Sequence, residues 1–157
     1  MMNNIFNVWN EMISEDFQKE IEDAGSKSSG EYEEVPHGKY EVSIEKMELK
    51  ATKTSNKPMV SIWMNIVSKG KFEGYKLFMN QVITQPFQVH IVNEFLRSLL
   101  KDCKDAPVIE FKNYTQYAGL LMDIHEKIAD NFEYAVDYGQ NKGFDTFKIF
   151  EVYSLVD

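Results

Sequence analysis

The sequence predicts a mostly β fold with helices, in the order β-β-β-α-α-β-β. Between residues 35 and 84, apolar and polar side chains alternate in three successive runs, which two lysine-bearing turns separate. Two segments with helical spacing of apolar residues follow, and the chain ends in a hairpin pattern around residues 139–143. Three strands, a helical connection and a final hairpin form the order of the OB-fold, a small and partly open barrel. We therefore expect an OB-fold-like β-barrel with one helix more than the minimal fold.

The first strand changes phase in its middle. Up to Ile44 the even-numbered residues are apolar, whereas from Met47 onward the odd-numbered residues are. A slip of one residue is what a β-bulge produces, so we expect a bulge between these two positions. The second strand, 60–66, has aliphatic residues on one face and Trp63 on the other, and the third strand covers 75–84.

Helix signals follow the third strand. Pro86 suits the first turn of a helix, and apolar residues repeat at helical spacing from Phe87 to about Lys101. A second helix is predicted over 114–129. The two final strands, 132–138 and 144–153, flank the glycines of the hairpin loop.

The first 34 residues differ in composition from the rest. They contain nine acidic residues against two lysines, and the spacing of Ile5, Trp9, Ile13 and Phe17 is typical of an amphipathic helix. Residues 24–34 have the composition of a flexible linker. The predicted domains are thus 1–34, an acidic helix and linker, and 35–157, the OB-fold-like domain. The helix could recruit a replication or recombination protein, compete with DNA for a basic face, or pack permanently on the barrel.

Charge is unevenly distributed along the chain. The formal net charge is −8, yet residues 35–81 hold eight lysines against four glutamates. No apolar run is long enough for a transmembrane helix, the N-terminus does not read as a secretory signal, and Cys103 is the only cysteine. We expect a cytoplasmic protein with no membrane partner.

The positive segment carries the residues expected to bind nucleic acid. Binding single strands without sequence preference requires a cationic groove and aromatic faces on which bases stack. Trp63 is the leading candidate for stacking, and its alternative role is packing beneath the N-terminal helix or a partner subunit. The predicted nucleic-acid-binding residues are Trp63, Phe72, Tyr75, Phe78, Lys50, Lys53, Lys57, Lys69, Lys71, Lys76, Lys142, Phe144 and Lys148.

The sequence gives little support to catalysis. The three histidines lie far apart, and only His90 and Glu94 stand at a helical spacing that could share a metal ion. Cys103 has no nearby group that would clearly activate it as a nucleophile, and there is no glycine-rich phosphate loop. We expect no enzyme activity, no catalytic or metal-binding residues and no cofactor.

Three motifs occur in a suggestive order. They are Pro36-x-Gly38-x-Tyr40-x-Val42, the lysine-rich turn from Lys50 to Lys57, and Gly70-Lys71-Phe72-Glu73-Gly74-Tyr75-Lys76-Leu77-Phe78. Over residues 35–100 the chain resembles a family of phage-encoded single-stranded DNA-binding proteins. These are small OB-fold-like proteins of phage replication and recombination modules, long catalogued as of unknown function. The resemblance implies an OB-like core and a role in the DNA metabolism of a virus or prophage, and hence a place in the host cytoplasm.

Two functions remain in competition at this point. The first is binding of single-stranded DNA, largely without sequence preference, through lysine–phosphate contacts and aromatic stacking. The alternative is an acidic phage adaptor or inhibitor that binds a host or phage protein. By analogy with other OB-fold binders, a homo-oligomer is an alternative to a monomer.

Overall fold

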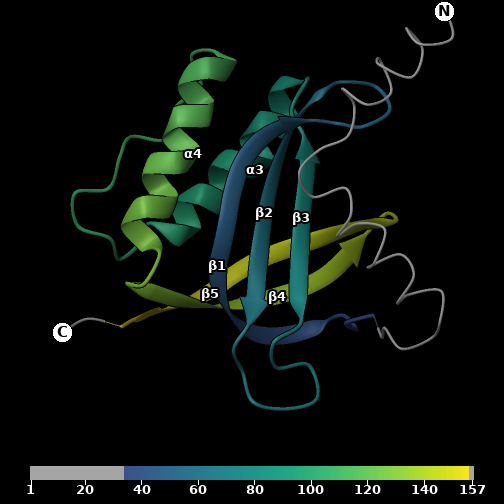
Figure 1. Ribbon diagram of the computed structural model, residues 1–157, viewed down its shortest axis with the longest axis vertical. Helices are drawn as coiled ribbons and strands as arrows, with labels where there is room; N and C mark the ends of the chain where they lie inside the picture. The colour runs from purple at the N-terminus through teal and green to yellow at the C-terminus, as the bar shows by residue number, and fades with distance from the viewer. Residues whose placement is uncertain (1–33, 156–157) are drawn as a thin grey trace, which may run out of the picture. The chain divides into compact units, whose positions relative to one another are not determined.

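The computed structural model describes residues 34–155, in which five strands and two helices follow one another (Figure 1). The elements are β1 (Gly38–Ala51), β2 (Pro58–Ile66), β3 (Lys76–Val82), α3 (Pro86–Leu99), α4 (Tyr114–Ile128), β4 (Phe132–Asn141) and β5 (Phe144–Ser154). Their order is the predicted one. The predicted acidic helix and linker lie outside the described residues, apart from Glu34. Within the described range, no helix is both long and apolar enough to cross a bilayer.

The five strands form one open antiparallel sheet in the order β3-β2-β1-β4-β5. The sequence predicted a barrel, but β3 and β5 remain the two edges, and in residues 34–155 no backbone ladder joins them. The helix α3 contacts both edge strands, and the two edges also approach each other directly without pairing. The predicted β-barrel is therefore not closed in the described residues, whereas the mostly β fold, the strands and their order along the chain were predicted correctly.

The strand β1 carries the β-bulge that its change of phase predicts. Its register places Ile44 opposite Met64 on β2 and then shifts, so that Lys46 lies opposite Trp63. Glu45 is the extra residue. Because the slip moves the second half of the strand by one position, the apolar side chains of both halves face the core.

The core lies between one face of the sheet and the two helices. The aliphatic residues that alternate along β2 are buried, as predicted; they are Val60, Ile62, Met64 and Ile66. The helices contribute Val92, Phe95, Leu96 and Leu99 from α3, and Tyr117, Leu120, Leu121, Ile124 and Ile128 from α4.

Two tyrosines are fully buried in this core with their hydroxyl groups bonded. The hydroxyl of Tyr134 on β4 donates to the carbonyl oxygen of Leu99 at 2.8 Å, and that of Tyr117 donates to Oδ1 of Asn93. Burial raises the pKa of Tyr117 to about 12 and lifts the pKa of Tyr134 above its usual range. Both phenols are therefore neutral at neutral pH.

Candidate nucleic-acid interface

Trp63 lies on the sheet face opposite the core, as the alternation along β2 predicts. Its neighbours Ile62 and Met64 are fully buried, whereas Trp63 is half-buried. We use the name Trp63 face for the side chains of β1, β2 and β3 that share this side of the sheet. They are Lys46, Glu48, Lys50, Ser61, Trp63, Asn65, Lys76, Phe78 and Asn80.

An aromatic pair with two cations forms the centre of the Trp63 face. Phe78 is opposite Trp63 in the register, and its ring meets the indole edge-on, with centroids 5.4 Å apart. The ammonium of Lys46 lies 4.6 Å from the Trp63 ring centroid, and that of Lys76 lies 5.5 Å from it. Both distances fall within the range of a cation–π contact. Phe78 is 43% exposed, so part of this aromatic surface is open to solvent.

The bulge in β1 decides which charge faces Trp63. Without the shift, Glu45 would be the residue opposite Trp63, whereas the shifted register puts Lys46 there. The sequence prediction did not include Lys46 in the site. Its position could have been found only by fixing the bulge to one residue and then pairing β1 with β2.

Carboxylates accompany the lysines of the Trp63 face. Nζ of Lys76 lies 2.9 Å from a carboxylate oxygen of Glu45, and Oε1 of Glu48 lies 3.4 Å from Nζ of Lys46 and 3.8 Å from Nζ of Lys50. The lysine charge of this face is thus partly neutralised within the protein. The sequence prediction missed this, because it counted lysines without pairing them across the strands.

The predicted lysines of the first loop extend the Trp63 face at one end. Lys53 and Lys57 are exposed in the turn between β1 and β2. Thr52 fixes this turn: its backbone N–H donates to the carbonyl of Lys57 at 2.8 Å, and its Oγ1 accepts from the N–H of Lys57 at 2.9 Å. Lys50 belongs to the Trp63 face and directly precedes the turn, so this end of the face lies beside Lys53 and Lys57.

The structure separates Phe72 and Tyr75 from Phe78. Phe72 packs edge-on against Tyr40 and Tyr75, with centroid distances of 6.5 Å and 5.4 Å, and all three rings lie against the core. The ammonium of Lys71 lies 5.7 Å from the Phe72 ring centroid, and Lys69 is exposed in the same loop. Phe72 and Tyr75 therefore help to close one end of the core, whereas Phe78 belongs to the Trp63 face.

The hairpin of β4 and β5 places the last predicted residues together. The strands continue to Asn141 and Phe144, so the loop is a two-residue turn of Lys142 and Gly143, both with positive φ. Phe144 is 76% exposed at this tip. Lys148 lies further along β5, opposite Asp137. These residues lie on a different pair of strands from the Trp63 face. In a nucleic-acid interface they would form a second wall of the binding site.

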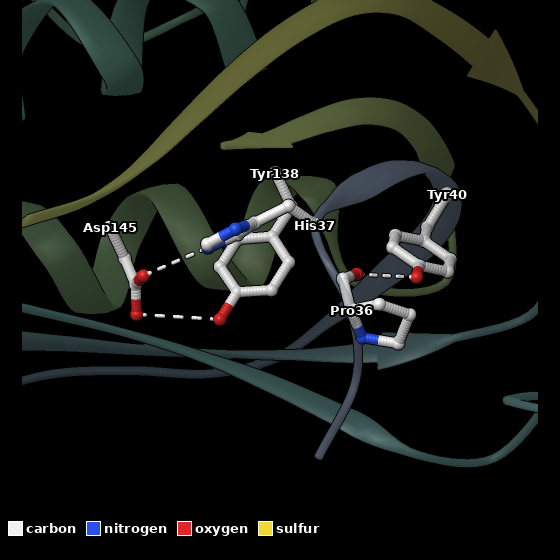
Figure 2. A network of polar contacts seen from close by, with 5 residues as sticks. All are labelled: Pro36, His37, Tyr40, Tyr138 and Asp145. Carbon is white, nitrogen blue, oxygen red and sulfur yellow. Dashed lines mark hydrogen bonds and ion pairs between the residues drawn. The ribbon is translucent and has the colours of Figure 1, made fainter. Parts of the chain in front are cut away.

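A polar network ties the start of β1 to this hairpin (Figure 2). Nε2 of His37 lies 3.2 Å from Oδ1 of Asp145, and the hydroxyl of Tyr138 donates to Oδ2 of the same carboxylate at 3.3 Å. The imidazole also meets the Tyr138 ring, with centroids 4.7 Å apart. Next to it, the hydroxyl of Tyr40 donates to the carbonyl of Pro36 at 2.6 Å (Figure 2). The network positions the hairpin relative to β1.

The described residues contain no obvious metal site. Between residues 34 and 155, no three His, Cys, Asp or Glu side chains gather closely enough to hold a metal ion. Glu94, half of the pair that the sequence singled out on α3, forms an ion pair with Arg97. The prediction of a protein without enzyme activity stays a prediction.

One protein family matches most of the chain. The family described as a protein of unknown function, DUF669, matches residues 22–130. The chain belongs to the DUF669 family. The matched segment of this DUF669 protein contains the three strands of the Trp63 face and both described helices, and it ends before β4. A search of the curated proteins finds no match for this DUF669 chain.

Proposed function

We propose that this DUF669 protein binds single-stranded DNA, largely without sequence preference, in phage replication or recombination. The observation that carries the proposal is Trp63 on the outer side of the sheet, with Phe78 at its edge and Lys46 and Lys76 beside its ring. An aromatic surface on which bases stack and cations that meet phosphates are the two requirements for binding single strands.

The strand arrangement supports the same proposal. An OB-fold is a partly open five-stranded barrel, and it holds oligonucleotides on the face of strands two and three. The loop between strands one and two and the loop between strands four and five flank the ligand. In this chain, those places are occupied by the Trp63 face, by Lys53 and Lys57, and by Lys142 with Phe144. We infer an OB-like core whose edges β3 and β5 are not paired.

One observation favours a second candidate function. Glu45 and Glu48 alternate with the lysines of the Trp63 face and form ion pairs with them. A face of mixed charge suits an adaptor or inhibitor that docks on a protein, and the net charge of −8 points the same way. This candidate predicts a complex with a phage or host protein that survives nuclease treatment.

A titration separates the two candidates. Fluorescence anisotropy would follow the binding of a labelled dT oligomer of about 30 nucleotides, a length that covers several OB-fold site sizes. The titration would be made at low and moderate salt, with duplex DNA of equal length as the competitor. Salt-sensitive preference for the single strand supports the proposal. No binding to dT at low salt would refute it and leave the adaptor.

Variants then locate the site. Replacing Trp63 by Ala should weaken binding about 5- to 150-fold, which corresponds to the roughly 1–3 kcal/mol that stacking contributes per base. Phe87→Ala is the matched control, because Phe87 is a 64% exposed aromatic residue on α3, outside the Trp63 face. Equal binding by the two variants would exclude Trp63 as the stacking platform. Thermal unfolding of both variants checks that the fold is intact.

A further inference from the structure

A hollow lined by both polar and apolar residues, Ile44 and Ala129 among the latter, opens beside the Trp63 face, where α4 ends against β1. It has a volume of about 360 Å³. The sheet contributes Ser43, Glu45 and Asn65 to its lining, and the end of α4 with the following turn contributes His125 and Asp130. It lies within the segment that matches the DUF669 family.

The hollow exists because β1 leaves β4 in the middle of the sheet. The two strands pair only from Gly38 to Val42, so the carbonyl of Ile44 has no partner on β4. Nε2 of His125 donates to this carbonyl at 3.1 Å. The imidazole thereby takes the place of the hydrogen-bond donor that a longer β1–β4 ladder would have supplied. The bulge at Glu45 follows immediately. The end of α4 thus lines one side of the hollow, and Ser43, Glu45 and Asn65 of β1 and β2 line the other.

The chemistry of the lining disfavours phosphate. Glu45 and Asp130 are carboxylates, no lysine or arginine among the described residues lines the hollow, and Glu45 forms an ion pair with Lys76. A carboxylate accepts hydrogen bonds from exocyclic amino groups such as N4 of cytosine. Within residues 34–155, the structure shows no partner for the side chains of Asn65 and Asp130. They remain available to the edge of a base.

The hollow is also close to the stacking platform. Asn65 lies two residues beyond Trp63 on the same side of β2, a separation of about 7 Å along a strand. Asn65 pairs with Lys76, whose ammonium lies 5.5 Å from the Trp63 ring centroid and 2.9 Å from Glu45. A strand with one base on Trp63 can therefore present the neighbouring base to the hollow, with its phosphate near Lys76.

We propose that this hollow receives the edge of one base and favours bases that carry an amino group where thymine carries O4, namely cytosine and adenine, over thymine. The inference rests on the proposed binding of single-stranded DNA and adds a modest preference at one nucleotide position. Asp130 is the discriminating residue, because Glu45 is already engaged by Lys76. Thymine offers O4 at the same place, an acceptor that a carboxylate repels.

The test compares dC and dT oligomers of equal length, and its readout is the ratio of the two dissociation constants. The wild-type protein should bind dC about fivefold more tightly, the lower end of what one specific base contact contributes. In Asp130→Asn the ratio should fall towards one, because an amide can donate to O4 of thymine as well as accept from N4 of cytosine.

Asp105→Asn is the matched control. Both aspartates have positive φ, 66° for Asp130 and 58° for Asp105, and asparagine tolerates this conformation. Both substitutions also change the net charge equally, and Asp105 does not line the hollow. The control should keep the wild-type preference.

Four results would contradict the inference, and they do so in different ways. A wild-type protein that binds dC and dT equally, or an Asp130→Asn variant that keeps the preference, overturns the hollow as a base site while the binding of single strands stands. If Asp105→Asn also loses the preference for dC, the preference depends on the net charge of the protein and not on the hollow. Failure to bind either oligomer overturns the proposed function, and the inference falls with it.

Discussion

Replacing Glu48 by Gln should strengthen the binding of single-stranded DNA. The carboxylate of Glu48 lies 3.4 Å from the ammonium of Lys46 and 3.8 Å from that of Lys50. The neutral amide of Gln releases both lysines from this internal partner while it keeps the size of the side chain. A phosphate then no longer competes with a carboxylate for either lysine.

The size of the effect follows from these two contacts. Side chains in the pairs are about one-third exposed, and solvent-exposed ion pairs contribute about 0.2–1 kcal/mol each. Two pairs thus amount to about 0.4–2 kcal/mol, which corresponds to about 2- to 30-fold tighter binding. Each additional phosphate contact should also steepen the salt dependence, by about 0.7 in the slope of log affinity against log salt.

The assay is an anisotropy titration of labelled dT over a series of salt concentrations. Glu110→Gln is the control, because Glu110 pairs with Lys112 at 3.4 Å in the loop before α4 and the substitution changes the net charge equally. If Glu48→Gln binds no more tightly than Glu110→Gln, the ion pairs of the Trp63 face do not limit phosphate contact. The reasoning about local charge would then be refuted.

Three further predictions concern stability and the hairpin. Tyr117 alone should lower the free energy of unfolding by about 2–3 kcal/mol between pH 10 and 12, because it keeps its proton in the fold while the unfolded chain loses it, and Tyr134, whose pKa is also raised, should add to this fall. Tyr117→Phe should reduce this fall in denaturant titrations at several pH values, and an unchanged fall would assign it to other groups. Ile62→Ala should cost about 2–5 kcal/mol, since Ile62 is fully buried, whereas exposed Val108→Ala should cost under about 0.5 kcal/mol in the same assay. Lys142→Ala should weaken dT binding and lower its salt slope by about 0.7, and an unchanged slope would remove the hairpin tip from the interface.

Local patterns in the sequence predicted most of the fold. The period of two identified the strands, the helical period identified α3 and α4, and the change of phase between Ile44 and Met47 located the bulge. Alternation on β2 also placed Trp63 away from the core. These features depend on neighbours in sequence, so they could be read without knowledge of distant contacts.

Features that depend on distant contacts were missed. The closure of a barrel depends on pairing between the edge strands β3 and β5, which lie far apart in the sequence and do not pair in the described residues. The partners of the lysines depend on cross-strand register, so Glu45 and Glu48 did not enter the predicted site. For the same reason, the aromatic cluster around Phe72 could not be distinguished from the exposed Phe78.

The unpaired edges of the sheet have a consequence for self-association. An edge strand offers backbone donors and acceptors to any other strand, which is a route to aggregation. Short length, charged side chains and bulges protect such edges. The strand β3 has only seven residues and begins with Lys76, and the β4–β5 pairing contains a register shift with Lys148 and Glu151 on either side. This sheet can therefore stay open without recruiting further strands from other copies.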